Sequence, residues 1–529
     1  MIEVSTSGGL SSSPYFWAVA AVLVAILFNN LLRAPSSLRR DASPIKAYSD
    51  AVLPGIGPIE LYEKRNSFLR SIFGDPESWH KSPPKQTAVR VNSRGHIMTI
   101  TNNPKVDGKV FFNDRGLDFN NAYEVMFAGI PQLPEWISKP KPDEVTGAAG
   151  FVYNLKLAVK PERLQNNIPH MVAHAVNLFK TLPAHNGRFT VHDTIYPLVF
   201  QISVLFVGLA EHARDINAVR KMEGPFWTFA DNVGFMPTHF PLFPVPSTVK
   251  KWYGAVKMSA EIRGTLQKRR QENRREDDYI QEMIDRGASD RVIEDFIMGG
   301  LFAAIINTTG VASYFLLFLH SDPVARDRVR SEFESVFRRA AEERGDDYDS
   351  LSLQEKLERT PLEVWESSLP YYEHVLDETL RILMTSLIFR RKLQTDSKAS
   401  QTESVISGER INNKEFIGFW LGSAHRNSTI YTDPEKFDPG RFERGEGRGD
   451  NEFVPWGAGR HVCLGMRFAK LEIKTVHAAF LLAFPTARCV DRNNAPYSPD
   501  NVPYPEKESE HRRLPQHPVW IAYDSNHLA

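Results

Sequence analysis

The stretch that decides the fold is PWGAGRHVCLG, which runs from Pro455 to Gly465. Its glycines are Gly457, Gly459 and Gly465, and it also contains Cys463, although the chain of 529 residues has only two cysteines. Glycine permits positive φ angles and a close approach of the backbone to a neighbouring group. The residues that follow have apolar side chains at helical spacing, so Cys463 is expected at the N-terminus of a helix. There the helix dipole and backbone N–H groups favour a thiolate, which is a good soft ligand for a metal centre.

The composition of the whole chain excludes several classes of protein. Lys and Arg together number 64, as do Asp and Glu, so no overall charge attracts nucleic acid, and we expect no nucleic-acid partner. Two cysteines argue against a disulfide framework and fit a reducing compartment. The second of them, Cys489, lies in TARCV without nearby glycines, and we expect it to be an ordinary structural residue. A chain with 42% hydrophobic and 24% charged residues is able to bury a large core.

The N-terminus has the composition of a membrane anchor. PYFWAVAAVLVAILFNNLL (14–32) carries no charge, and about 19 residues at ~1.5 Å each span roughly 28 Å. Four basic residues follow it before residue 47, whereas only Glu3 precedes it, so the rest of the chain should face the cytoplasm. The alternative, a cleaved signal peptide, lacks a basic leading region and a small-residue cleavage site. The sequence therefore predicts a lumenal tail (1–13), a transmembrane anchor (14–32), a polar linker (33–55) and one large domain (56–529).

The pattern of the remaining chain is mainly helical, with a smaller part rich in β-structure. TAVRVNSRGHIMTIT (87–101) alternates around a Ser-Arg-Gly turn and predicts a hairpin. Most of 155–385 has helical periodicity, and shorter strands and turns follow before one long helix from about 465 to 484. NVGFMPTHFPLFPVPS (232–247) is rich in Phe, Met and Pro, and it either bends over an apolar cavity, dips into a bilayer or forms a buried connection.

Two further patterns carry polar groups. DFIMGGLFAAIINTTGVASYFLLFLH (295–320) predicts a buried apolar helix, whose polar interruption is the NTT of 307–309. These three residues are either functional or a satisfied core Asn beside threonines that bond back to their own helix. Glu378 and Arg381 lie three apart and share a helix face, which on its own is also compatible with a surface ion pair.

The residues around Cys463 resemble a known signature. The aromatic Trp456, then Gly459, Cys463 and Gly465, have the spacing of the haem-binding motif of the cytochrome P450 family, in which a cysteine thiolate ligates the haem iron. The resemblance implies that Cys463 is the axial ligand. Trp456 stands where Phe is usual and keeps an aromatic ring near the sulfur side of the porphyrin. His461 stands where many members have Arg, and the resemblance implies that it pairs with a haem propionate.

The other motifs come in the order that the family requires. The pair Glu378 and Arg381 is similar to the buried Glu-x-x-Arg of the family, and Arg441 of FDPGRF matches the third member of that structural lock. Gly440 stands where an acidic residue is commoner. Arg390 matches a position that often binds a haem propionate, and the alternative is a cation at a strand edge. Three apolar residues after the Arg381 helix should line a pocket or pack in the core: Met384, Leu387 and Ile388.

The helix at 295–320 departs from the family pattern. By resemblance, Thr308 is the alcohol that helps to hold the water that protonates iron-bound dioxygen, and Ala304 matches the first position of the same element. Asn307 replaces the usual acid and cannot ionise, so a direct carboxylate relay is lost, while Thr308 and ordered water remain. Ile305 replaces a glycine and is expected to narrow the groove where dioxygen bends toward the helix.

The resemblance covers roughly residues 50 to 529 and implies a mainly helical, triangular prism with a smaller β-rich part that encloses haem b. It implies a membrane-anchored, fungal-like microsomal monooxygenase in the endoplasmic reticulum membrane, with the catalytic domain in the cytoplasm. NADPH–cytochrome P450 reductase would supply electrons from NADPH, with cytochrome b5 as an optional second partner. A loose similarity of 112–126 and 232–244 to substrate-facing segments of sterol 14-alpha-demethylases suggests a bulky lipophilic substrate, such as a terpenoid, a sterol or another secondary metabolite.

Two alternatives remain open from the sequence. Ile305 and Asn307 are compatible with a peroxide isomerase or dehydratase of the same fold, which would need no reductase. The second alternative is a membrane-anchored helical protein without enzymatic activity, in which Cys463 is inert.

Overall fold

The computed structural model describes residues 43–48, 57–93, 95–126, 140–239, 243–394, 403–505, 515 and 517–528. The expected lumenal tail, the transmembrane anchor and most of the linker lie outside these residues. Within the described part of the chain, Asp290–Ser321 is the one helix long and apolar enough to cross a membrane. It is mostly buried inside the protein, as expected for a central core helix.

Helices make up most of the described chain. Those of eight residues or more are α3 (Arg65–Phe73), α6 (Gly147–Ala158), α7 (Pro161–Lys180), α8 (Val191–Phe206), α10 (Ile216–Ala230), α12 (Pro246–Gln271), α14 (Asp290–Ser321), α15 (Pro323–Arg344), α18 (Pro370–Leu383) and α21 (Met466–Ala483). The shorter ones are α2 (Glu60–Glu63), α4 (Asp107–Asn113), α5 (Asn120–Met126), α9 (Ala210–Ala213), α11 (Phe235–His239), α13 (Tyr279–Asp285), α16 (Leu353–Glu358), α17 (Leu362–Ser367), α19 (Gly422–His425) and α20 (Gly440–Glu443), with 3₁₀ turns η3 (Pro76–Ser78), η4 (Tyr348–Ser350) and η6 (Gly459–His461).

The strands form one larger sheet and two small ones. The sheet order is β1-β2-β3-β9-β6-β4, and separate sheets have the orders β10-β11-β5 and β7-β8. Strands β2 and β3 pair antiparallel from Ala88 opposite Thr101 to Ser93 opposite His96, which confirms the predicted hairpin. The bounds are β1 (Lys46–Ala47), β2 (Ala88–Ser93), β3 (His96–Thr101), β4 (Leu117–Asp118), β5 (His185–Thr190), β6 (Leu387–Lys392), β7 (Val405–Ile406), β8 (Glu409–Arg410), β9 (Phe416–Trp420), β10 (Arg488–Val490) and β11 (Trp520–Ser525).

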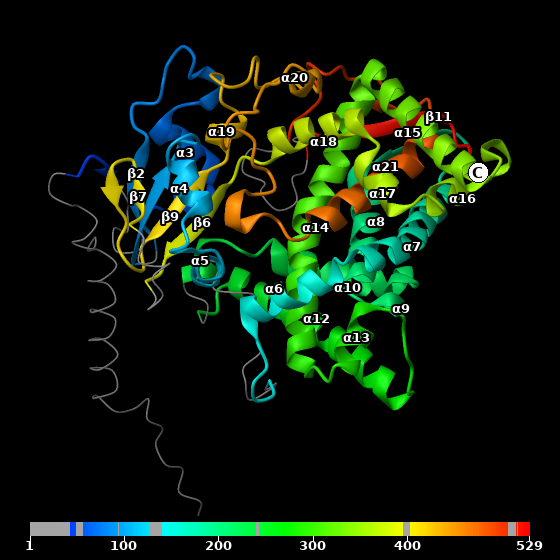
Figure 1. Ribbon diagram of the computed structural model, residues 1–529, viewed down its shortest axis with the longest axis horizontal. Coiled ribbons are helices and arrows are strands. Elements are labelled where there is room, and N and C mark those ends of the chain that lie inside the picture. The colour runs from blue at the N-terminus through cyan, green and yellow to red at the C-terminus, as the bar shows by residue number, and fades with distance from the viewer. Residues whose placement is uncertain are drawn as a thin grey trace, which may run out of the picture.

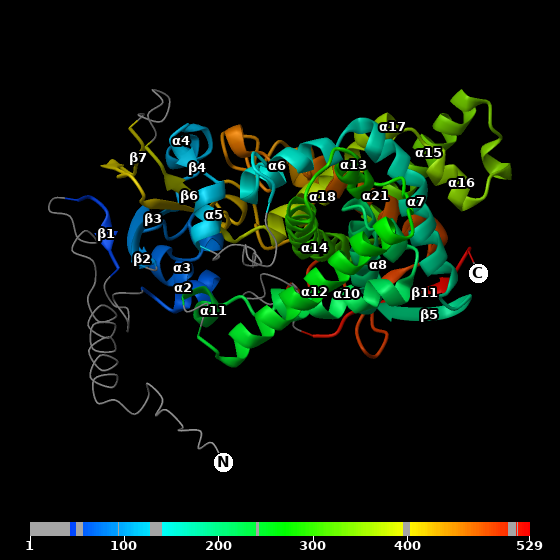
Figure 2. The same ribbon diagram turned by 90° about the horizontal axis from the view of Figure 1, so that it is seen from below.

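The larger sheet lies at one end of the molecule and most of the helices at the other, with α14 running between them through the helical part (Figures 1 and 2). At ~1.5 Å per residue its 32 residues extend about 48 Å. The Ser289 side chain caps its first turn by accepting a hydrogen bond from the Val292 N–H. Helices α6, α8, α12, α18 and α21 pack around it. Because neighbours cover nearly all of its length, α14 tolerates apolar residues on every face.

Helix α21 is held against α14 and α18 by one buried histidine. The His477 Nε2–H donates to the Ala312 carbonyl oxygen at 2.9 Å, and its Nδ1 accepts from the Tyr372 hydroxyl at 2.8 Å. The Phe468 ring, in the first turn of α21, stacks on Phe206 of α8 with centroids 3.7 Å apart. These contacts fix the helix that the Cys463 loop leads into.

Candidate active site

The loop before α21 is closed by its own backbone. The Cys463 N–H donates to the Trp456 carbonyl oxygen at 2.7 Å, and the Gly457 N–H donates to the Val454 carbonyl oxygen at 3.0 Å. Gly459 has a φ of 58°, and a Cβ there would lie 2.4 Å from the Phe112 carbonyl oxygen, so only glycine fits. In both views the orange segment that leads into α21 lies between the large sheet and α14 (Figures 1 and 2).

Gly465 differs in backbone conformation from the other two glycines of the loop. Its φ is −84°, an ordinary value for any residue, whereas Gly457 has a φ of 72°. A Cβ on Gly465 would meet no protein atom within 4 Å. Gly457 and Gly459 therefore use the positive φ that glycine permits, whereas Gly465 does not and has open space where a Cβ would be.

The Cys463 thiol is enclosed yet retains accessible surface. Burial raises its pKa, while the backbone N–H groups of Gly465 and Met466 act in the opposite direction. The sequence predicted that backbone N–H groups at the helix N-terminus favour a thiolate, and these two amides are the groups that act in that direction. A coordinated metal ion deprotonates a thiol outright, so the two amides would then stabilise the bound thiolate.

Glu378, Arg381 and Arg441 meet in a fully buried cluster on the same side as the Cys463 loop. The Arg381 guanidinium donates to both Glu378 carboxylate oxygens at 2.7 and 2.8 Å, and the Arg441 Nε–H donates to Oε1 at 3.0 Å. All three side chains have 0% exposure. Arg381 also donates to the carbonyl oxygens of His425 and Pro434, both at 2.8 Å. A buried ion pair is stable only when its remaining hydrogen-bonding groups are satisfied, and here they are.

Sequence reasoning missed a second carboxylate in this cluster. The Glu446 Oε2 accepts from the Arg441 NH1 at 2.9 Å, so two guanidinium groups face two carboxylates. Glu446 lies between glycines in GEG, five residues after Arg441, and only the turn there brings it back. Its backbone N–H donates to the Arg441 carbonyl oxygen at 3.0 Å, which identifies that turn.

Arg390 and His461 come together beside two aromatic rings. The Arg390 guanidinium lies over Phe111 and Phe119, at 4.7 and 5.0 Å from the ring centroids, and His461 stacks on Phe119 at 5.9 Å. Burial lowers the pKa of Arg390 to about 10, and no described carboxylate pairs with it. Burial and the Arg390 charge also lower the pKa of His461, whose Nε2 lies 3.4 Å from the Leu117 carbonyl oxygen. The site thus holds a buried cation next to an imidazole; no described carboxylate forms a salt bridge with it, although the Asp118 charge acts on the pKa of both groups in the opposite direction to burial.

The middle of α14 has one exposed face. Ala303 and Asn307, four residues apart, are exposed, whereas Thr308 and Thr309 are buried at 3% and 0%. The Asn307 Nδ2–H donates to the Ala303 carbonyl oxygen at 3.0 Å, and the Thr309 hydroxyl donates to the Ile305 carbonyl oxygen at 2.7 Å. The Thr308 hydroxyl makes no hydrogen bond within the described part of the chain. The three polar residues are therefore not equivalent.

Ile305 lies on a different face of α14 from Asn307. It is fully buried and lies about 200° around the helix from Ala303, which is the face opposite the exposed one. Its side chain packs in the main core cluster. Ile305 therefore does not share a face with Asn307, but it lies three residues before Thr308 on the same side of the helix, and the expected narrowing of the dioxygen groove stays a prediction.

The residues of the Cys463 loop and those around Arg390 fit a large, flat ligand that has acidic groups at its edge. Val462 and Leu464, on either side of Cys463, keep 42% and 37% of their surface exposed, as apolar residues would beneath an apolar disc. The buried Arg390 Nε–H and the buried Trp456 Nε1–H have no described hydrogen-bond partner. A haem would cover the apolar residues, bind its iron to Cys463 and place propionates at Arg390 and His461.

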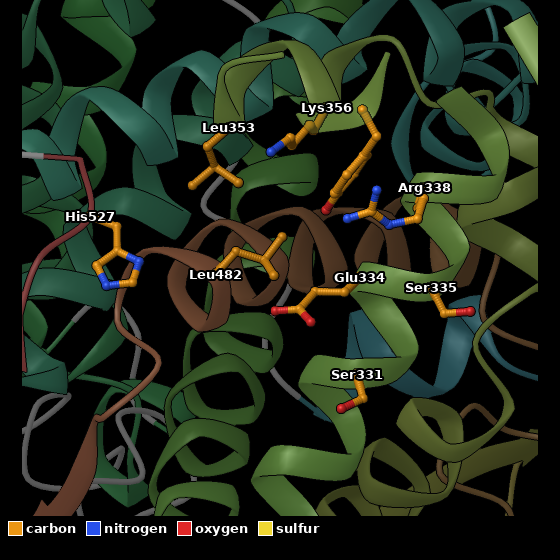
Figure 3. Close-up of a pocket in the computed structure, with 9 residues that line it drawn as sticks. Ser331, Glu334, Ser335, Arg338, Leu353, Lys356, Leu482 and His527 are labelled. Carbon is orange, nitrogen blue, oxygen red and sulfur yellow. The ribbon is translucent and has the colours of Figure 1, made fainter. Parts of the chain in front are cut away.

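A separate pocket of about 760 Å³ lies away from these residues, between α15, α16 and the end of α21 (Figure 3). Glu334, Arg338 and Lys356 line it with charged groups, and Tyr348 and His527 are also among its walls. In both ribbon views α15 and α16 are at the end of the molecule away from the large sheet (Figures 1 and 2). It contains none of the residues predicted from the sequence, and we assign it no part in the site.

Cys489 lies on β10 in the main core, and burial raises its pKa strongly, which agrees with the expected structural role. Met384 and Ile388 are partly buried around the Phe111 and Phe112 cluster, and Leu387 is buried in the sheet core.

Comparison with known proteins agrees with this geometry. The profile of the family described as Cytochrome P450 matches residues 188–509. The chain is 26% identical over 392 residues to cytochrome P450 monooxygenase AacuE of Aspergillus aculeatus, covering 73% of this chain and 76% of that protein. It is 22% identical over 475 residues to cytochrome P450 monooxygenase dmxR5 of a Cryptosporiopsis species, covering 88% and 89%. To ent-kaurenoic acid oxidase 1 of Arabidopsis thaliana it is 23% identical, covering 65% and 66%.

A solved structure has the same fold. The retinoic acid-bound cyanobacterial CYP120A1 superposes with a TM-score of 0.63 at 18% sequence identity, covering 91% of this chain and 99% of that one. This similarity confirms the predicted mainly helical fold with a smaller β-rich part.

Proposed function

Because the chain belongs to the cytochrome P450 family, we propose that it is a haem-thiolate monooxygenase that oxidises a bulky lipophilic substrate with dioxygen and electrons from NADPH. The observation that carries this proposal is the accessible Cys463 thiol, held in a self-bonded loop beside a fully buried Glu378–Arg381–Arg441 cluster. The catalytic domain is 56–529.

The chain's own residues would hold haem b in three ways. Cys463 is the axial ligand, and the N–H groups of Gly465 and Met466 stabilise its charge. Arg390 and His461 bind the propionates, and Trp456 and Gly459 shape the loop under the ring. When bound, the haem supplies the oxygen chemistry, and thiolate ligation favours cleavage of the O–O bond. The buried Arg390 has no described salt-bridge partner and only the charge of Asp118 nearby, so binding an acidic group there offsets part of its desolvation cost.

Proton delivery is assigned to two adjacent residues of α14: Asn307, which is exposed, and Thr308, which is buried. Asn307 donates its amide N–H to the Ala303 carbonyl oxygen, and its side chain is exposed, so water is able to reach it. Thr308 has a hydroxyl that is not committed to the helix, in contrast to Thr309. A water held between these two groups passes a proton without any carboxylate. This arrangement supports Thr308 as the catalytic alcohol and Asn307 as a group that orients water.

The substrate is proposed to be a terpenoid, a sterol or another lipophilic secondary metabolite. The AacuE and dmxR5 proteins are named as monooxygenases, and ent-kaurenoic acid oxidase is named for a terpenoid acid. The exposed side chains beside Cys463 and on α14 are mostly apolar, which supports an apolar substrate.

We propose that the protein works at the endoplasmic reticulum membrane with NADPH–cytochrome P450 reductase, and optionally cytochrome b5. Four apolar residues before and along α12 are more than half exposed: Phe243, Val249, Tyr253 and Val256. In α12 they recur at i, i+4 and i+7, a stripe suited to a lipid surface. Helix α11, just before it, is bound to α2 through the Glu63 carboxylate, which accepts from the Phe235 N–H at 2.7 Å. The stripe thus lies near the part of the chain that follows the proposed anchor (14–32).

The test is turnover with purified reductase. The full chain loaded with haem should consume NADPH and dioxygen and give oxygenated products from a panel of terpenoids and sterols, first screened by spin-state shift. The second candidate is a peroxide isomerase or dehydratase, which the Asn307 side chain favours because it cannot ionise. Rapid rearrangement of organic hydroperoxides without NADPH, and no product with the reductase, would establish the second candidate and overturn the first.

A further inference from the structure

We propose that His425 is a positioning residue that holds the start of the Cys463 loop in register with the end of α18. This inference rests on the proposed function, because its consequence is the fraction of protein in which Cys463 remains the iron ligand. The sequence analysis assigned no role to His425.

Both ring nitrogens of His425 are bonded to backbone groups whose roles are fixed. Its Nδ1 lies 2.6 Å from the Met384 carbonyl oxygen, which only accepts, so Nδ1 carries the proton. Its Nε2 accepts from the Val454 N–H at 3.0 Å, which only donates. The side chain is fully buried. These two bonds define a single neutral tautomer.

The two bonds join parts of the chain that are far apart in sequence. Met384 follows the last residue of α18, the helix that carries Glu378 and Arg381. Val454 begins the loop: its carbonyl oxygen accepts from the Gly457 N–H at 3.0 Å, which forms the turn before Cys463. The imidazole therefore spans the distance from the buried cluster's helix to the ligand loop.

The His425 backbone adds a third connection. Its carbonyl oxygen accepts from the Arg381 NH1 at 2.8 Å. The charge cluster thus holds the residue by its main chain, and the residue holds the loop by its side chain. No other described side chain bonds to the Val454 N–H, so without the imidazole this buried donor is left without a partner, which is costly.

The neutral state of His425 is consistent with this role. Burial, together with the nearby Arg381 charge, lowers its pKa to about 4, and the Met384 carbonyl oxygen opposes that shift. A cationic ring would direct an N–H at the Val454 N–H. Among the described residues, the ring that packs against it is the uncharged Phe453, at 5.6 Å between centroids.

The experiment compares two substitutions that each keep one of the bonds. In His425→Gln the amide oxygen reaches the position of Nε2 and accepts from Val454, whereas in His425→Asn the amide reaches only the position of Nδ1 and bonds Met384. Each full-length protein is loaded with haem, reduced and bound to CO, and the thiolate Soret band is measured against the band of the form without thiolate ligation. Far-UV circular dichroism and a urea titration report folding separately.

We expect His425→Gln to keep the wild-type ratio of the two bands and His425→Asn to lower it about tenfold, since the Val454 donor is orphaned. His477→Gln is the matched control, because His477 is equally buried and also has both nitrogens bonded, but to α14 and α18. It should lose stability and keep the ratio. The proposal is overturned if His425→Asn keeps the wild-type ratio, or if His477→Gln lowers the ratio as much. A wild-type protein without any thiolate band would instead refute the proposed function.

Discussion

The region around the Cys463 loop and the middle of α14 differ in how completely their polar side chains are hydrogen-bonded. In the fully buried cluster, the Glu378 carboxylate accepts from Arg381, Arg441 and the Asp438 N–H, and backbone carbonyl oxygens accept further N–H groups of the two arginines. On α14 the Thr308 hydroxyl has no described partner, and Asn307 is exposed. The buried cluster is densely hydrogen-bonded and holds the loop of the proposed ligand in place. The middle of α14 keeps polar groups for water and substrate. The comparison shows that the densest hydrogen bonding lies around the loop that carries the proposed iron ligand. The part of α14 that is proposed to deliver protons has fewer hydrogen bonds.

The largest effect is expected from removing the negative charge of the cluster. Glu378→Gln leaves Arg381 and Arg441 buried without their shared carboxylate, and the loss of one partner of a buried pair costs about 3–5 kcal/mol. The free energy of unfolding, from urea titration of the haem-loaded protein, should fall by that amount. Glu446→Gln is the control: its carboxylate keeps 16% exposure and bonds only Arg441 of these two arginines, so a smaller loss is expected. Equal losses in the two variants would contradict the account.

A second effect, of about 2 kcal/mol per residue, is expected from acid. Burial lowers the pKa of His425 to about 4 and those of His477 and His320 to about 3. In the unfolded chain each titrates near pH 6.5, so between about 6.5 and 4 the unfolded state binds more protons, and stability falls as the pH falls. At ~1.4 kcal/mol per pH unit, each costs about 2 kcal/mol between pH 7 and 5.

The urea midpoint at pH 7 and pH 5 measures this loss. Removing one titrating group in His477→Gln should reduce the loss by about 2 kcal/mol relative to the wild-type protein. An identical loss in both proteins would mean that these histidines are not held neutral.

The two adjacent threonines of α14 sharpen the comparison further. Thr308→Val removes the uncommitted hydroxyl, and we expect the ratio of oxygenated product to NADPH consumed to fall about tenfold, because protons no longer reach their target in time. Thr309→Val removes a hydroxyl that is bonded to its own helix, and that ratio should not change. If Thr309→Val uncouples the reaction instead, the assignment of the alcohol is wrong.

The smallest effect on stability is expected at Asn307. Because the side chain is exposed, Asn307→Asp should change the free energy of unfolding by no more than about 0.5 kcal/mol. It should nevertheless raise the rate of product formation, since a carboxylate is able to relay protons directly. A lower rate with unchanged stability would indicate that the amide orients the substrate and not water.

Much of this architecture could be predicted from sequence because local patterns report local structure. Neighbouring residues alone were enough to predict three features: the glycine-flanked loop of Cys463, the apolar helix α14 and the hairpin at 87–101. The Glu378–Arg381 pair could be found only because its spacing resembles a family motif, since burial itself depends on Arg441 and on carbonyl oxygens from 425 to 436.

What sequence could not give was long-range geometry. The orientation of Ile305 depends on the rotation of α14 against its neighbours, and the ordinary φ of Gly465 depends on how the loop meets α21. The pKa of the Cys463 thiol depends on burial that no local pattern reports. His425 bonds to residues 41 and 29 positions away, so nothing in its neighbourhood indicated a role.

The measurement that tests the central claim most directly is the reduced, CO-bound absorption spectrum of the haem-loaded protein. The account predicts the red-shifted thiolate Soret band in the wild-type protein and in Cys489→Ala, and its loss in Cys463→Ala with the fold intact by circular dichroism. A band that survives Cys463→Ala, or that disappears in Cys489→Ala alone, would contradict the account.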